Sequence, residues 1–222
     1  SFKKENLLSE NRDKIHKMPY TEGKYIEEYK ITKKLYVEWD TNRCPTRLVR
    51  PTFPELYPPD KLLMARQKRV STLSEDGVVC DNTIILGVPY YELKGVKNRS
   101  ISKYFTNLGL DRDEAEEKSR NFDLRYILAI LNSKLTSYIL KFNARSKTDS
   151  YPDDWKKMPI PDISKETQEI LAKKVDLILK LNKKDSTEEN KKIKQMQSEI
   201  DEIVYKLFKI KKKDISVIEE SL

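Results

Sequence analysis

The spacing of apolar residues in this 222-residue chain changes near Asp123. Before this position, β-branched and aromatic residues occur in short runs that prolines and turn residues interrupt, a pattern typical of short strands and loops. After it, apolar residues recur every three or four positions, which predicts helices. The chain therefore predicts an α+β fold: a small mixed or antiparallel sheet with packed helices, followed by an antiparallel helical hairpin.

The first half contains the signals of several short strands. Residues 62–65 form a continuous apolar run, which predicts a buried strand. Residues 70–73 and 78–80 flank a Glu-Asp-Gly turn signal that ends at Gly77, so we expect a hairpin in which Gly77 adopts positive φ. Residues 83–88 are the clearest strand of the chain.

The second half predicts three longer helices. Apolar residues from Leu124 to Ile139 lie on a broad helical face, so this helix should be buried and pack on the sheet. Residues 170–179 and 193–207 predict two amphipathic helices joined by a polar segment, in which Ser186 is expected to cap the second helix. Their apolar seam is too short for a free coiled coil, so we expect it to pack within the chain or against a partner domain.

The charge of the chain favours a polyanionic partner. Its 44 Lys and Arg residues outnumber its 36 Asp and Glu residues, which gives a net charge of +8. The late lysine runs suit the solvated faces of helices. Several arginines lie instead in the strand-rich half, and their planar guanidinium groups suit bidentate contacts with phosphate or guanine.

Membrane and secreted classes are excluded by composition. No apolar run approaches the ~20 residues needed to cross a bilayer, and no secretory signal pattern opens the chain. We therefore expect a cytoplasmic protein without membrane contact. Cys44 and Cys80 are too few for a disulfide framework and lack metal-ligand spacing, so we interpret both as reduced thiols. The chain begins at Ser1 rather than Met, which indicates a piece of a longer protein.

The sequence contains no catalytic constellation. Its single histidine, His16, lies in a polar segment and has no second histidine with which to share a metal. The acidic segments at residues 111–117 and 151–154 lack the spacing of a Mg²⁺ site, so we interpret them as residues that begin helices. No glycine-rich phosphate loop occurs. We therefore expect that the chain alone is not an enzyme and holds no cofactor or metal.

Four motifs occur in one order along the chain. The first motif combines a strand at residues 61–66, which ends in a basic residue, with a later segment at 78–83 that ends in Asp-Asn-Thr. Residues 126–135 form a helix that carries Leu-Asn-Ser, residues 155–161 form a proline-bounded exit, and residues 200–208 form a closing helix. In this order the motifs resemble the TaqI-like C-terminal specificity domain, the target-recognition domain of type IIG/IIS restriction-modification DNA methyltransferases, which is related to type I specificity subunits. The resemblance covers nearly the whole chain.

The resemblance implies that this chain reads a double-stranded DNA sequence while other domains do the chemistry. An adenine methyltransferase domain that binds S-adenosylmethionine would act in cis or in trans, and in some such enzymes a nuclease domain that uses Mg²⁺ precedes it. Residues 1–162 would form the recognition domain, and residues 163–222 would form a helical spacer or docking element. The chain departs from the family at Lys209, where a glycine normally ends the last helix. The sequence therefore does not define the residue at which this helix ends.

The resemblance and the basic residues together indicate where DNA would bind. Arg66, Lys68 and Arg69 follow the buried strand and are the first candidates for the major groove or its rim. Asn82 either binds adenine through two hydrogen bonds or belongs to an Asx turn beside Asp81. The remaining candidates are expected to contact phosphate or to keep the surface solvated: Arg47, Arg50, Lys97, Arg99, Arg145 and Lys147.

Other residues near these motifs are expected to have structural roles. Asn132 and Ser133 belong to the motif helix, and we expect them to satisfy buried backbone groups rather than to contact DNA. Tyr90 and Tyr91 are expected to pack within the fold.

Two other classes of function stay open. The helical hairpin would suit a protein-interaction module, or a specificity subunit that docks a separate methyltransferase. The basic residues of the sheet would then keep the surface solvated and would not bind DNA. A nuclease with an unrecognised metal site at Asp153 and Asp154 is the second alternative. The salt dependence of DNA binding separates the first alternative from DNA recognition, and Mg²⁺-dependent cleavage of a plasmid tests the second.

Overall fold

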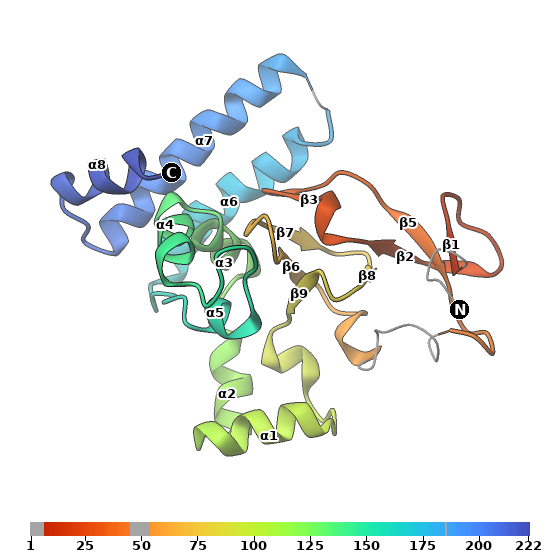
Figure 1. Ribbon diagram of the computed structural model, residues 1–222. Coiled ribbons are helices and arrows are strands. Elements are labelled where there is room, and N and C mark those ends of the chain that lie inside the picture. The colour runs from red at the N-terminus through yellow and green to blue at the C-terminus, as the bar shows by residue number, and fades with distance from the viewer. Residues whose placement is uncertain (1–6, 45–53, 185) are drawn as a thin grey trace.

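The computed structural model describes residues 7–44, 54–184 and 186–222. In these ranges the chain forms nine short strands and then eight α-helices, as Figure 1 shows. The strands lie in three small sheets, and the helices gather on one side of them. The structure is α+β, which confirms the fold class predicted from the period of the apolar residues.

The N-terminal sheet has four strands, which are in spatial order β1 (Leu8–Ser9), β5 (Leu35–Glu38), β2 (His16–Thr21) and β8 (Val79–Cys80). β2 pairs with β5 antiparallel and with β8 in parallel. A short 3-10 helix, η2 (Gly23–Tyr25), leads to a two-stranded ribbon of β3 (Ile26–Glu27) and β4 (Lys30–Ile31). Leu7, which precedes β1, joins apolar side chains of these strands in an N-terminal core that includes Tyr20, Val37 and Val79.

The central sheet has three antiparallel strands, which are in spatial order β7 (Ser71–Ser74), β6 (Lys61–Ala65) and β9 (Ile84–Gly87), after the 3-10 helix η3 (Pro54–Leu56). Every residue of β6 is buried. Leu62 and Met64 lie in a core shared with the helices, whereas Leu63 and Ala65 lie in the N-terminal core. Alternate side chains of one strand therefore enter two different cores. The predicted strands at residues 62–65 and 83–88 are both confirmed.

The hairpin predicted between residues 70–73 and 78–80 is wrong. β7 pairs with β6, so the hairpin is β6–β7 and its turn carries residues 66–70. β8 lies in the other sheet, parallel to β2. β6 offers β7 four paired positions, whereas β8 has only two residues, so pairing with β6 buries more side-chain surface. Gly77 does adopt the predicted positive φ, at 70°, but there it redirects the chain from one sheet to the other.

Helices α3 (Leu124–Leu131) and α4 (Lys134–Asn143) stand where one continuous helix was predicted from Leu124 to Ile139. The apolar period runs across the break, so periodicity alone does not reveal it. The apolar face of α3 packs on the central sheet, because Leu128 and Ala129 share a core with Leu62 of β6. The prediction of one long helix is wrong, but its predicted burial against the sheet is confirmed.

The break between α3 and α4 is made by two polar side chains. Asn132 Oδ1 accepts a hydrogen bond from the Ser71 N–H of β7 at 2.8 Å, and Asn132 Nδ2 donates to the Ser71 carbonyl at 2.9 Å. The Ser133 side chain then caps α4 by accepting from the Thr136 N–H at 3.3 Å. Both side chains satisfy backbone groups in the interior, which confirms the structural role expected of them.

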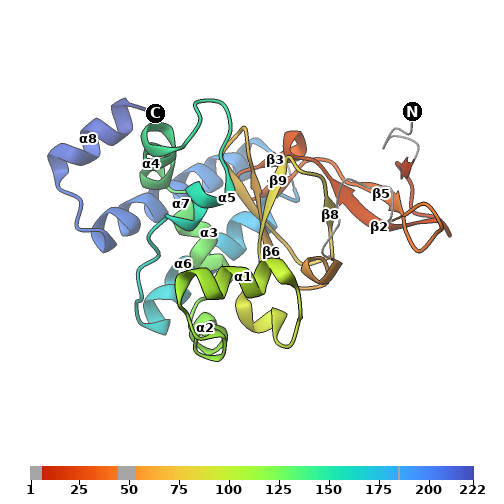
Figure 2. The same cartoon turned by 60° about the horizontal axis from the view of Figure 1, so that its bottom comes forward.

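A helical extension projects from the central sheet, as Figures 1 and 2 show. It consists of η4 (Tyr90–Leu93), α1 (Arg99–Leu108) and α2 (Arg112–Ser119). Tyr90 lies against Tyr104 and Phe105, with ring centroids 6.3 and 5.0 Å away. The Arg120 guanidinium carbon lies over the Tyr91 ring, 4.7 Å from the centroid of that ring. Tyr90 and Tyr91 therefore pack within the fold as expected.

The C-terminal helices form the predicted antiparallel hairpin, α6 (Lys165–Leu181) and α7 (Thr187–Leu207), after the short helix α5 (Pro152–Lys156). Ser186 caps α7 as predicted, because its side chain accepts a hydrogen bond from the Glu189 N–H. The apolar residues of both helices join the core of α3, for example Leu171 and Val204. The seam thus packs within the chain. The division between residues 162 and 163 stays a prediction.

The end of α7 is defined by a residue that is not glycine. Lys209 adopts the left-handed conformation at φ 54°, where the resembled family has glycine. The Lys209 N–H donates to the Lys206 carbonyl at 3.0 Å, and the Ile210 N–H donates to the Tyr205 carbonyl at 2.9 Å. These two bonds are those of a Schellman motif. α7 therefore ends as in a glycine-terminated helix, and α8 (Lys212–Glu220) follows.

Candidate nucleic-acid interface

The β6–β7 turn and the loop between α4 and α5 are joined by the side chain of Arg69. Its Nη1 donates to the Leu140 carbonyl at 3.1 Å, and its Nη2 donates to the carbonyls of Ser146 and Lys147 at 2.8 and 2.9 Å. Arg69 has a positive φ of 57°, as expected in a tight turn. One guanidinium therefore binds three carbonyl groups that lie at the end of α4 and in the following loop.

Arg66 connects the same loop to the β8–β9 turn. Its Nε donates to the Ser150 carbonyl at 3.3 Å, and its Nη1 donates to the Asn82 carbonyl at 3.1 Å. The Arg66 carbonyl in return accepts from the Ser150 N–H at 2.9 Å and from the Ser150 hydroxyl at 2.8 Å. Three segments that are distant in sequence thus meet at one place, which we call the loop cluster: residues 66–70, 81–83 and 144–151.

An aromatic ring lies between two guanidinium groups of the loop cluster. The Tyr151 ring centroid is 4.8 Å from the Arg66 guanidinium carbon and 5.5 Å from that of Arg145. Such cation–π contacts hold arginine side chains in place. The Asp154 carboxylate closes the loop, because it accepts from the backbone N–H groups of Arg145 and Tyr151 at 3.0 and 2.8 Å. The Arg145 side chain is exposed at the surface of this ordered loop.

The exposed cations of the loop cluster are Lys68, Arg145 and Lys147. Lys68 Nζ donates to the carbonyls of Lys24 and Ile26 at 2.8 and 3.2 Å. Among the residues that the structure describes, none of the three cations forms an ion pair with a carboxylate. Their charge is therefore available to an external anion.

The structure brings together six of the ten candidate DNA-binding residues in the loop cluster: Arg66, Lys68, Arg69, Asn82, Arg145 and Lys147. Two others lie on a separate element, because Lys97 precedes α1 and Arg99 is its first residue. Arg47 and Arg50 lie outside the described residues. The Asn82 side chain is exposed, while the Asx turn predicted there is formed by Asp81, which accepts from the Thr83 N–H at 3.0 Å.

Sequence reasoning placed the arginines near a surface but missed their internal partners. Arg66 and Arg69 hold backbone carbonyls of residues about 70 to 85 positions later in the chain, and no local pattern indicates such contacts. It also missed Tyr151, which orders the two guanidinium groups. The only local sign was Pro152, a residue typical of a first helical turn, which places Tyr151 at the cap of α5.

The acidic segments begin helices, as interpreted from the sequence. Asp111 caps α2 by accepting from the Glu114 N–H at 2.9 Å, and Asp153 and Asp154 lie in the first turn of α5. Within the described ranges, no group of three or more His, Cys, Asp and Glu side chains is placed to hold a metal ion. His16 Nδ1 lies 2.8 Å from Asp13 Oδ2.

Several buried groups have shifted pKa values, and none of those described next is a residue of the loop cluster. Burial raises the pKa of Asp201 to about 6, and its Oδ1 accepts the Lys134 N–H at the start of α4 at 2.8 Å. Burial likewise raises the pKa of Glu28 to about 6. Burial lowers the pKa of Lys61 to about 8, and its Nζ donates to the Pro59 carbonyl at 2.8 Å. Burial also raises the pKa of the free Cys44 thiol to about 11.

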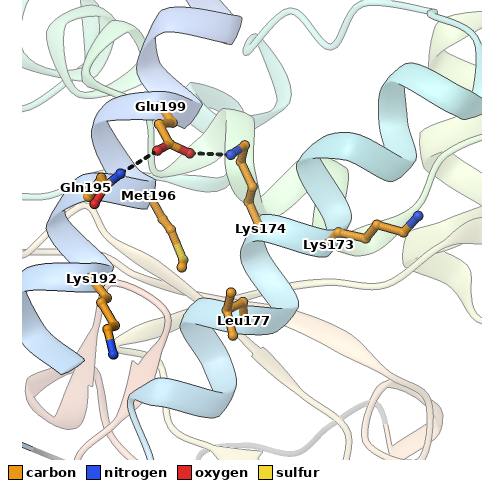
Figure 3. A pocket seen from close by; sticks show the side chains of 7 residues that line it. All are labelled: Lys173, Lys174, Leu177, Lys192, Gln195, Met196 and Glu199. Carbon is orange, nitrogen blue, oxygen red and sulfur yellow. Dashed lines mark hydrogen bonds and ion pairs between the residues drawn. The ribbon is translucent and has the colours of Figure 1, made fainter.

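A groove of about 260 Å³ lies between α6 and α7, as Figure 3 shows. Leu177 and Met196 face one another across it. Its lysines are already neutralised, because Lys174 pairs with Glu199 within the groove. The other two groove lysines pair with carboxylates on their own helices, which are Glu169 for Lys173 and Glu188 for Lys192. This groove therefore offers less free positive charge than the loop cluster.

In the described part of the chain, no helix combines the length and the apolar character needed to cross a bilayer. No protein-family model matches the chain, and no curated protein sequence matches it.

Proposed function

We propose that this chain is the DNA target-recognition part of a restriction-modification system. In this proposal it positions double-stranded DNA for an adenine methyltransferase domain, and for a nuclease domain where one is present, in cis or in trans. S-adenosylmethionine and Mg²⁺ belong to those other domains. The observation that carries the proposal is the loop cluster, where exposed cations without carboxylate partners project from loops that internal hydrogen bonds hold in place.

The basic side chains of the loop cluster have two different roles. Arg66 and Arg69 each donate side-chain hydrogen bonds to backbone carbonyls, so they fix the shape of the loops. Arg145, Lys147 and Asn82 are exposed on those loops, where they can contact phosphate or base edges. A rigid loop loses little conformational entropy when it binds, which favours specific recognition.

Neutralising Arg145 and Lys147 is expected to weaken binding of the chain to a random-sequence duplex about tenfold at moderate salt, and to reduce the slope of log affinity against log salt by about 2, because two phosphate contacts are lost. The measurement is a fluorescence-anisotropy titration of Arg145→Gln, Lys147→Gln at several salt concentrations. The thermal stability of this variant should fall only slightly, because both side chains are exposed and loss of the Arg145 contact with Tyr151 costs at most about 1 kcal/mol.

A matched control removes the same charge elsewhere. Lys191 and Lys194 are exposed on α7, so Lys191→Gln, Lys194→Gln lowers the net charge equally. We expect this control to change the salt slope little. Equal losses of DNA affinity in both variants would show that only net charge attracts DNA. A flat salt slope for the unmodified chain would contradict DNA recognition and favour the protein-interaction alternative.

A further inference from the structure

α1 is an amphipathic helix whose exposed face carries positive charge only. Its sequence from Arg99 to Leu108 contains no acidic residue. Arg99 and Lys103 lie one helical turn apart on the same face, and both are exposed. Lys97 precedes them and is also exposed. The helix therefore presents a short basic ridge to solvent.

The opposite face of α1 fixes the helix to the body of the protein. Phe105 is buried, and its ring lies 5.0 Å from that of Tyr90 in η4. Tyr104 lies 6.3 Å from Tyr90 between ring centroids. This aromatic packing fixes the orientation of α1, so the basic ridge is held facing outward.

α5 connects this ridge to the loop cluster. It begins directly after Tyr151, the ring that lies against Arg66 and Arg145, and it ends at Lys156. Lys156 Nζ lies 4.2 Å from the centroid of the Tyr104 ring on α1. A five-residue helix spans about 7 Å, so the exposed Lys156 connects the loop cluster to the Tyr104 side of α1 along the protein surface.

The cations of this surface lack acidic partners. Among the described residues, no ion pair with a carboxylate involves Lys97, Arg99, Lys103, Lys156 or Lys157. Helix α2 shows the contrast, because Arg112 pairs with Glu116 at 2.7 Å and Arg120 pairs with Glu117 at 3.4 Å. Counterions or an external polyanion must therefore balance the charge of α1.

We infer that α1 is a second DNA-contact element, which binds the phosphate backbone beside the segment that the loop cluster contacts. This inference rests on the proposed function. Arg99 and Lys103 would contact phosphate oxygens, and Lys156 would extend the contact across α5. Because phosphate carries no base identity, α1 contributes affinity and register, whereas base reading stays with the loop cluster.

The test compares Arg99→Gln, Lys103→Gln with the charge-conserving variant Arg99→Lys, Lys103→Arg, on a random-sequence duplex across a salt series. We expect the glutamine variant to lose about tenfold in affinity and about 2 in salt slope, because two phosphate contacts are removed. The charge-conserving variant should retain both. Lys191→Gln, Lys194→Gln again controls for net charge.

The outcomes separate this inference from the proposed function. Suppose that the unmodified chain binds duplex DNA and that neutralising Arg145 and Lys147 weakens binding, while the α1 glutamine variant behaves like the α7 control. The α1 inference would then be wrong and the proposed function would stand. If the unmodified chain has no salt-dependent affinity for duplex DNA, both are wrong.

Discussion

Replacing Arg69 with methionine is expected to destabilise the protein by about 3 kcal/mol, because three carbonyl acceptors would lose charge-assisted hydrogen bonds. These carbonyls belong to Leu140, Ser146 and Lys147. Methionine keeps much of the aliphatic length of arginine but has no donor. The change in stability is measured by urea unfolding, as a shift of the midpoint at constant slope.

The same substitution should also weaken duplex binding, although the Arg69 guanidinium donates to carbonyls of the protein itself. Without Arg69 the loop that carries Arg145 and Lys147 is no longer held in one position, so binding must order it at an entropic cost. Arg69→Lys distinguishes this account from a pure charge effect, because lysine keeps the charge but lacks the planar fork. We expect Arg69→Lys to restore neither full stability nor full binding. Complete rescue by lysine would show that Arg69 acts through its charge alone.

Replacing Asn132 with leucine is expected to cost about 2 kcal/mol of stability, because the buried Ser71 N–H would lose the Asn132 Oδ1 acceptor. The Ser71 carbonyl would keep one bond, from the Tyr29 N–H at 2.9 Å. Leucine has a similar volume and fills the space, so water cannot easily replace the lost amide. The effect is measured by the same urea titration.

Asn82 provides the matched control for Asn132. It is exposed in the β8–β9 turn, so Asn82→Leu should change the unfolding free energy by less than about 0.5 kcal/mol. Similar stability of the two leucine variants would mean that the Asn132 side chain does not join α3 to β7. Duplex binding gives a second readout, since the Asn82 variant is expected to lose DNA affinity while the Asn132 variant should retain it when folded.

The sequence predicted the elements that depend on local pattern. The apolar run at residues 62–65 is a buried strand, and the two amphipathic segments after residue 163 form the antiparallel hairpin. Ser186 caps α7 as predicted. These features depend on residues a few positions apart, so spacing and capping preferences are sufficient to find them.

The errors came from contacts between distant residues. β7 pairs with β6 rather than with β8, although a turn signal stands between β7 and β8. The helix expected to span residues 124–139 breaks because the Asn132 amide bonds to Ser71, 61 positions earlier. Apolar period carries no information about such a cross-chain bond, so tertiary contacts override the local preference.

In the candidate site too, local features were predicted and contacts between distant residues were not. Arg66 and Arg69 were correctly placed at the end of a buried strand, but their hydrogen-bond partners lie in the loop after α4. The sequence also suggested Arg145 and Lys147 without any sign that they adjoin Arg66. Folding brings these residues together in the loop cluster, where they have different roles. Arg66 and Arg69 anchor the loops, and Arg145 and Lys147 are exposed cations.

The central claim is that this chain recognises a particular DNA sequence, and selection from a randomised duplex library tests it most directly. The intact chain is incubated with the library near physiological salt, and the bound duplexes are recovered and sequenced over several rounds. The account predicts that one short motif becomes enriched, since loops held in place by Arg66 and Arg69 present fixed groups to base edges. Recovery of duplexes with no shared motif after repeated rounds would contradict it.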